Sequence, residues 1–404
     1  MTSNIERKII NIPNNPTELR IPPGRHRLEF TFDSKQDAGY YEIDPAGDLT
    51  IKVIEYDFTT TDGRGRHHIL RTALMKVSRQ VLMNNSTTLK TMLSGPFKEA
   101  GSNFIELHED TVHSLELWFR VLHGNIGDGS YEIERVEIWN AIALSRKYFF
   151  HLEELNPWFA TYWSRLDKKN LETDDLKELL YPAQALDHPV AFAYITKTLA
   201  HICTGHIEEE NPSRHWQLHV EGRVIQQINA AKGSMRKEII KGLFDPLDEF
   251  CNCSVKEKSL WEYLKGVKMT KIWPLHTMHT RSNHTIIDSP GFVQWKCVIP
   301  EGACLSCTKK LRGAHIAKTR SKILNYWQGL CLDCMNISTP RTGDIDKDYW
   351  MHSMNEDWGK GCRIQHQRNT WYFSFMGRLS IMSSFMWEQQ ERKKAAQRCY
   401  SDSD

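Results

Sequence analysis

The chain has 404 residues, of which 40% are hydrophobic and 25% are charged, and its formal net charge is +2. Such a composition is typical of globular proteins and argues against wholesale disorder, and the length suits two or three domains. The near balance of charge excludes a general attraction to nucleic acid or to anionic membranes, so binding of that sort would have to be local.

The first residues, Met1 to Arg7, lack the apolar core of a secretory signal. We therefore expect an intracellular protein, cytoplasmic or nuclear, that does not associate with membranes. In a reducing compartment the ten cysteines are better explained as thiols or metal ligands than as disulfides.

The two ends of the chain give the weakest patterns. Residues 1–47 form a proline-rich leader whose order the composition does not decide, with one strand expected at Leu28 to Phe32. Residues 341–404 form a tail with a helix. Its aromatic stretch from Trp371 to Trp387 contains a glycine, an arginine and four serines, so we do not interpret it as a transmembrane segment.

Strand patterns begin at residue 48. Leu49, Ile51 and Val53 alternate with polar residues, which predicts a half-buried strand. Leu74 to Val77 is a second apolar run, and we interpret the long polar stretch between the two, Glu55 to Arg71, as an insertion because hairpin connections are normally short. A short strand is expected at Phe104 to Leu107.

Helical patterns follow these strands. Asn85 and Ser86 can cap a helix that carries Leu89, and Gly95-Pro96 ends it, with glycine tolerating a left-handed conformation. The spacing of three, four and three residues in a later segment predicts one buried stripe, formed by Val112, Leu115, Phe119 and Leu122. A closing helix is expected over 134–150, with one apolar face that contains Ile138, Trp139, Ile142, Ala143, Phe149 and Phe150.

The order and spacing of these segments resemble a BTB/POZ domain. The resemblance lies in Gly47 to Thr50, Val77 to Arg79, Leu89 to Glu99, Phe104 to Leu107, Leu115 to Gly124 and Ala143 to Tyr148. It implies an α+β module of three short strands and a helical cluster over residues 48–150, which mediates protein association. Ser78 departs from the pattern, since many members have histidine there.

A mainly α-helical region is expected over residues 151–250. Helices are predicted at Pro157 to Leu166, Asp174 to Leu180, His188 to Cys203 and Val220 to Phe244. In the third of these, Pro189 suits the first turn.

A cysteine-rich region follows over 251–340. Two C-x-x-C pairs, Cys304 with Cys307 and Cys331 with Cys334, are 23 residues apart (331 − 307 − 1 = 23). Each pair can point two sulfurs at one metal ion, so the four thiolates predict a structural zinc site, with four unrelated thiols as the alternative. We expect Cys251, Cys253 and Cys297 to be ordinary thiols and His276, His279 and His284 to be surface imidazoles, rather than a second site.

The linker between the two pairs is basic. Its cations are Lys309, Lys310, Arg312, Lys318, Arg320 and Lys322. They could contact nucleic-acid phosphates, but we favour a solvated helix whose other face packs Ile323 and Trp327 against the zinc module. Residues from Cys251 to Leu275 and from Gly329 to Met335 also resemble the tails of BTB-domain proteins of fungal type.

No phosphate-binding loop, nucleophile elbow or zinc-protease motif is present, so we expect a protein that is not an enzyme. We predict an adaptor that associates with itself as a homodimer, with a second BTB domain, or with a cullin scaffold of a ubiquitin ligase. Phe97 and Glu99 resemble the hydrophobic-x-Glu signature that some family members use against cullin. The alternatives are that Phe97 only packs the end of its helix, and that the protein is a zinc-containing regulator that binds nucleic acid.

Overall fold

The computed structural model describes residues 38–337 and 361–366, and the chain divides into two compact units. The first unit runs up to Lys168 and also contains Asn211–Leu218; the second contains Lys169–Glu210 and the chain from His219 onward. The helices after residue 168 and the cysteine-rich region thus share one unit. The predicted strand at Leu28 to Phe32, the helix of the tail and the stretch from Trp371 to Trp387 lie outside the described residues.

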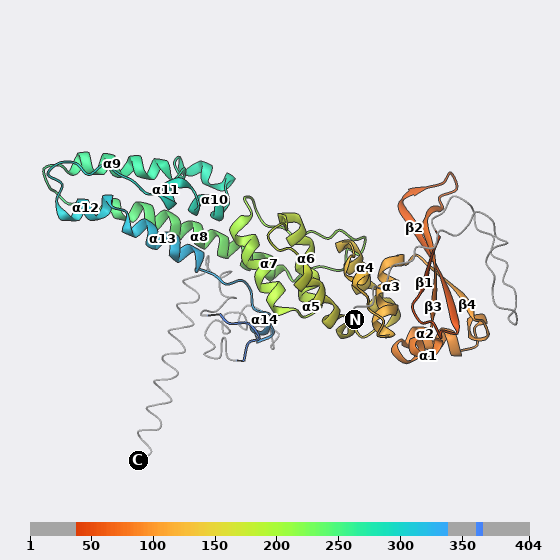
Figure 1. The fold of residues 1–404 in the computed structure, drawn as a ribbon. Coiled ribbons are helices and arrows are strands. Elements are labelled where there is room, and N and C mark those ends of the chain that lie inside the picture. The colour runs from red at the N-terminus through yellow and green to blue at the C-terminus, as the bar shows by residue number, and fades with distance from the viewer. Residues whose placement is uncertain (1–37, 338–360, 367–404) are drawn as a thin grey trace, which may run out of the picture. The chain divides into compact units, whose positions relative to one another are not determined.

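The first unit contains a four-stranded sheet with the order β1-β3-β2-β4 (Figure 1). Strand β2 is antiparallel to β3, whereas β1 runs parallel to β3 and β4 runs parallel to β2. The strands are β1 (Ala38–Glu42), β2 (Leu49–Thr61), β3 (His67–Val77) and β4 (Phe104–His108). Leu49, Ile51 and Val53 are all buried, which confirms the alternation predicted for this segment.

The polar stretch from Glu55 to Arg71 is not an insertion between the strands. It continues both of them, and the turn occupies only residues 62–66. The Asp62 carboxylate closes that turn by accepting hydrogen bonds from the backbone N–H groups of Arg64 and Arg66, at 2.8 and 2.9 Å. Exposed strands need not alternate strictly, because neither face of the extension is buried deeply enough to demand apolar residues.

The first unit also contains helices, of which the one that follows β4 packs against β2 and β3. The helices are α1 (Arg79–Asn85), α2 (Thr87–Ser94), α3 (Val112–Leu122), α4 (Arg135–Tyr148) and α5 (Asn156–Arg165), with single 3₁₀ turns η1 (Lys98–Gly101), η2 (Asp128–Tyr131) and η3 (Leu152–Leu155). The Ser86 hydroxyl accepts from the Leu89 N–H at 2.9 Å and so confirms the predicted cap. Gly95 does end α2, but its φ of −81° is not left-handed.

The core of the first unit joins the sheet to α3 and α4. Trp118 and Trp139 are fully buried, and the Trp118 indole donates to the Ala141 carbonyl at 2.7 Å. The prediction that Phe149 shares the buried face of α4 is wrong. That helix ends at Tyr148, Phe149 turns left-handed (φ 55°), and its side chain is 66% exposed while Phe150 returns to the core.

The second unit is helical in its described part. Its elements are α6 (Thr173–Ala185), α7 (Pro189–Ile202), α8 (Gly222–Asp248), α9 (Lys256–Met269), η4 (Leu275–Thr280), α10 (Asn283–Ile287), α11 (Pro290–Val293), α12 (Leu305–Leu311), α13 (Ala314–Leu324) and α14 (Leu332–Ile337). These elements confirm the predicted helices near residues 188–203 and 220–244. Pro189 occupies the first turn of α7, as predicted.

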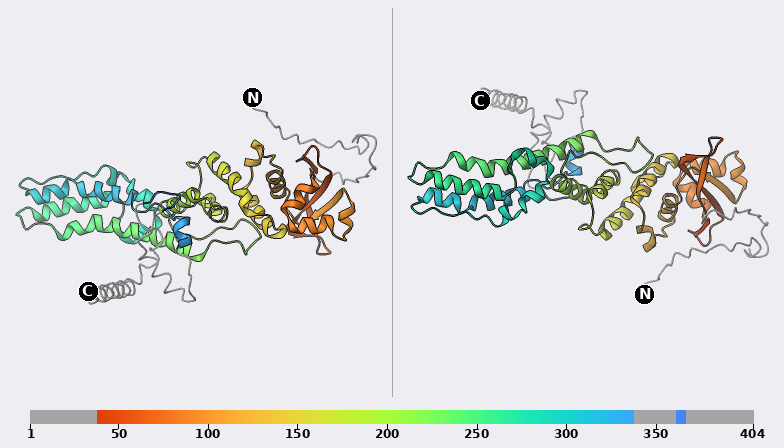
Figure 2. Two further views of the ribbon diagram at one scale, coloured as in Figure 1. Left: turned by 90° about the horizontal axis from the view of Figure 1, so that it is seen from below. Right: turned by 90° about the horizontal axis from the view of Figure 1, so that it is seen from above.

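Helix α8 is the longest described helix of the second unit, and α13, α9 and α12 run beside it in all views (Figures 1 and 2). Helix α13 packs tightly on α8 at Gly242, where a β-carbon would overlap the Thr319 side chain. Gly313, with φ of 73°, makes the tight turn from α12 into α13. Within the described ranges, no helix combines the length and apolar character that a membrane span requires.

Candidate metal centres

Four cysteines meet where α8 ends and α12 begins. Cys251 and Cys253 follow α8, Cys304 is the N-cap of α12, and Cys307 lies in its first turn. Their four Sγ atoms lie within 4.8 Å of one another. We call this set the first cysteine group.

The spacing within the first cysteine group suits a metal better than a disulfide. The Sγ atom of Cys251 is 3.1 Å from that of Cys304 and 3.3 Å from that of Cys307, and the Sγ atoms of Cys253 and Cys307 are 3.9 Å apart. A disulfide bond measures about 2.05 Å. A tetrahedral zinc ion with Zn–S bonds of about 2.3 Å places its sulfurs about 3.8 Å apart, so only small shifts would bring these sulfurs onto one ion.

The first cysteine group borders a hydrophobic cluster that contains one of its four cysteines, and the other three pack against the same cluster. Phe250, Tyr263, Val267 and Leu311 form this cluster together with Cys307, which is fully buried. The Tyr263 hydroxyl donates to the Leu243 carbonyl of α8 at 2.9 Å, which ties α9 to α8 next to the cysteines. The apolar side of the group therefore excludes water, as a structural metal site requires.

Local hydrogen bonds favour the thiolate at two of these four cysteines, whereas hydrogen bonding to Cys304 raises the pKa of Cys251 and burial raises the pKa of Cys307. The backbone N–H of Cys307 points at the Cys304 sulfur and, with Cys251, lowers the pKa of Cys304 to about 6. Hydrogen bonding to Cys251 also lowers the pKa of Cys253. Because metals bind the thiolate and not the thiol, a cysteine at a helix N-terminus is a ready ligand.

A second group lies at the start of α14 and contains Cys331, Cys334, Cys362 and His366. The Cys334 Sγ atom is 3.7 Å from the Cys362 Sγ atom and 3.4 Å from the His366 Nε2 atom, and all four ligand atoms lie within 4.8 Å of one another. Cys331 and Cys334 are fully buried. A hydrogen bond from Cys334 lowers the pKa of Cys331 to about 5.

The structure does not bring the four predicted zinc ligands together. Cys304 and Cys307 belong to the first cysteine group, whereas Cys331 and Cys334 belong to the second. Each C-x-x-C pair meets a different partner pair, because α13 and the turn after it separate the two pairs along the unit. Cys251 and Cys253, which we expected to be ordinary thiols outside the zinc site, lie with Cys304 and Cys307 in a group that could hold a metal ion. Both groups are compatible with zinc.

Two sequence patterns point to the missed partners. The C-x-C pair is one, and the other is Cys362-x₃-His366, which has the spacing of a common ligand pair. Cys297 stays outside both groups, and burial raises the pKa of its thiol to about 11. His276, His279 and His284 also lie outside both groups and are exposed.

Three of the six cations of the basic linker bond to groups inside the second unit. Lys310 donates to the Glu249 carbonyl, Arg320 pairs with Asp288 at 2.6 Å, and Lys322 pairs with Glu238. Ile323 and Trp327 are buried, as predicted for the face that packs inward. Pairing with acidic groups lowers the charge that this helix could offer to phosphates.

Phe97 and Glu99 lie between α2 and β4, at the start of η1. Phe97 is 52% exposed, and its ring also lies close to Gly95 at the end of α2. Glu99 is half-buried, and its carbonyl accepts from the Ser102 N–H at 3.3 Å. The pair therefore presents one apolar ring and one carboxylate on a short, hydrogen-bonded turn.

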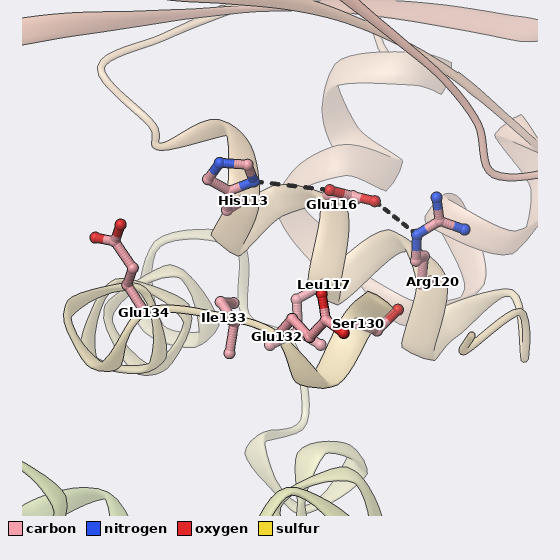
Figure 3. Close-up of a pocket in the computed structure, with 8 residues that line it drawn as sticks. All are labelled: His113, Glu116, Leu117, Arg120, Ser130, Glu132, Ile133 and Glu134. Carbon is pink, nitrogen blue, oxygen red and sulfur yellow. Dashed lines mark hydrogen bonds and ion pairs between the residues drawn. The ribbon is translucent and has the colours of Figure 1, made fainter. Parts of the chain in front are cut away.

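One open hollow in the first unit contains ionisable groups (Figure 3). Glu116 lies between His113 and Arg120, with its carboxylate 2.8 Å from the Arg120 Nε atom and 3.8 Å from the His113 Nδ1 atom. Because the arginine already neutralises Glu116, we interpret this arrangement as structural. The hollow is lined by His113, Glu116, Leu117, Arg120, Ser130, Glu132, Ile133 and Glu134.

No family model, no curated protein and no solved structure matches the chain.

Proposed function

We propose that the first unit is a BTB/POZ-type recognition module and that the protein acts as an adaptor through protein association. The order of elements carries this proposal. A hairpin of β2 and β3 is followed by the helix pair α1 and α2, then by β4 parallel to β2, and then by α3 and α4. That order agrees with the resemblance found in the sequence.

Phe97 supports a cullin as one partner. An exposed aromatic ring on a fixed turn can fill an apolar pocket, and such anchors dominate the affinity of many interfaces. Arg79 holds this turn in place. Its guanidinium donates to the Leu93 carbonyl before the turn and to the Ser102 carbonyl after it. The anchor would thus lose little conformational entropy on binding.

The test is capture of a purified cullin N-terminal domain by the full chain, compared between Phe97→Ala and Phe149→Ala. Phe149 is a matched control, because it is an exposed phenylalanine of the same unit. Cullin binding that is lost only in Phe97→Ala supports the adaptor. If the native chain captures no cullin, light scattering decides whether it self-associates. A chain that neither binds cullin nor self-associates contradicts the proposal.

We further propose that zinc fills the first cysteine group and has a structural role. Four thiolates form a closed shell with no position for a substrate or water, which is the usual chemistry of a structural zinc site. When bound, the metal would join the end of α8 to the start of α12 through Cys251, Cys253, Cys304 and Cys307. It would stabilise the helical unit that accompanies the recognition module.

A further inference from the structure

We propose that Cys331, Cys334, Cys362 and His366 hold a second zinc ion, which works as a clasp for residues 361–366. This inference does not depend on the recognition function. Three sulfurs and one imidazole nitrogen complete a Cys₃His shell, one of the common structural zinc sites. Their atoms already lie within 4.8 Å of one another.

The base of the clasp is fixed on helix α7. Leu330, next to Cys331, is fully buried, and its N–H donates to the Thr196 hydroxyl at 2.8 Å. Gly329 adopts φ of 91°, and any β-carbon there would overlap the Ala193 carbonyl. The first two ligands are therefore positioned by packing before a metal binds, as a precise metal site requires.

The second half of the site is oriented by Arg363, the residue after Cys362. Its guanidinium forms two parallel bonds to Asp187, at 2.7 and 2.8 Å, in the turn between α6 and α7. It also donates through Nε to Asp333 at 2.9 Å, and its backbone N–H donates to the same carboxylate at 2.7 Å. Asp333 lies between the two cysteines of the fixed pair, so Arg363 aligns the two halves of the site.

The ion pair between Arg363 and Asp187 is open to solvent, since the two side chains are 44% and 52% exposed. Solvent screens such a pair and reduces what it contributes to stability. Twenty-seven residues separate Cys334 from Cys362 (362 − 334 − 1 = 27), and closing a loop of that length has an entropic cost. A metal that binds ligands from both sides offsets this cost, because its binding free energy becomes folding free energy.

The first measurement is zinc content of the full-length protein by mass spectrometry. We expect about two ions per chain, one for each group. Cys362→Ser with His366→Ala should lower the content to about one, and so should Cys251→Ser with Cys304→Ser. Cys203→Ser is the matched control, because Cys203 is buried in the same unit but belongs to neither group, and it should leave the content unchanged.

The second measurement is trypsin cleavage after Arg363. In the zinc-loaded native protein the bond should resist cleavage, and Cys362→Ser with His366→Ala should speed cleavage by about tenfold or more, because protection requires an ordered segment. Loss of the first cysteine group should leave Arg363 protected. His366→Cys, which keeps four ligands, should retain both the metal and the protection. When cobalt replaces zinc in the site, this variant should have a different absorption spectrum from the native protein.

Two results would overturn the proposal. One is a native zinc content that does not fall when Cys362 and His366 are replaced. The other is equal cleavage after Arg363 in the native chain and in that double variant. Neither result bears on cullin capture or self-association, so failure here is distinguishable from failure of the recognition function.

Discussion

The Sγ atoms of Cys251 and Cys304 lie 3.1 Å apart although 53 positions separate them in the chain. Between them the chain forms α9, η4, α10 and α11 and then returns to α8. A metal bound here would therefore close a long excursion at its base, and its binding free energy would add to the free energy of folding.

The first prediction concerns Cys307, the fully buried ligand of that group. Cys307→Ser should remove the metal and lower the free energy of unfolding by about 4 kcal/mol, a size typical of the loss of a metal site. Chemical denaturation in excess zinc, with metal content measured in parallel, checks this. Cys297→Ser is the control, since Cys297 contacts the same hydrophobic cluster but is not a ligand. Equal losses in the two variants would contradict a metal role.

The second prediction concerns the contact between α8 and α13 at Gly242. Alanine normally favours a helix interior over glycine by about 1 kcal/mol. Here the added methyl group would overlap the Thr319 side chain, so Gly242→Ala should instead destabilise the protein by about 2 kcal/mol, as overpacking does. Thermal unfolding of the single and double variants measures the coupling.

Thr319→Ala should rescue the Gly242→Ala variant, because it removes the atoms that the new methyl group meets. Additive effects of the two substitutions would show that the helices do not approach each other at this point.

Local patterns in the sequence predict the helices and strands well, but they do not predict which of these elements come into contact. The alternation of Leu49, Ile51 and Val53 identifies a strand because burial of one face leaves a period of two. Helical periodicity does not predict the exposure of Phe149, because the backbone turns left-handed at this residue where α4 ends. The pairing of Cys304 with Cys251 depends on how α8 and α12 pack, and no local spacing encodes that.

The third prediction concerns the hydrogen bond between Tyr148 and Asp110. Asp110 is buried and accepts from the Tyr148 hydroxyl and from the Lys147 ammonium group. Burial, together with this carboxylate, raises the pKa of Tyr148. Tyr148→Phe should lower the free energy of unfolding by about 2 kcal/mol, since it leaves a buried carboxylate without one of its donors.

Urea denaturation measures the Tyr148→Phe effect, with Tyr56→Phe as the control. Tyr56 also forms a side-chain hydrogen bond, to His108 at 2.8 Å, but it is partly exposed, so water can replace the lost partner. We expect the control to lose less than about 0.5 kcal/mol. A larger loss in the control would show that the burial of Asp110 does not explain how much its hydrogen bond with Tyr148 contributes to the free energy of unfolding.

The fourth prediction concerns His201, a buried imidazole near the end of α7. Burial, and secondarily the charge of Lys197, lowers its pKa to about 4 from an ordinary value of 6.5. Between these two values the unfolded chain binds a proton that the folded chain does not. Stability should therefore fall as the pH is lowered from 6.5 to 4, by about 1.4 kcal/mol per pH unit from this group alone.

His201→Leu removes that proton, so the difference in unfolding free energy between the native protein and this variant should change with pH only between about 6.5 and 4. Excess zinc limits the loss of metal at low pH. Any pH dependence that the metal sites still add is common to the native protein and to His201→Leu, so it cancels in the difference between them. Parallel profiles of His201→Leu and the native protein would mean that the folded chain already admits a proton at this imidazole.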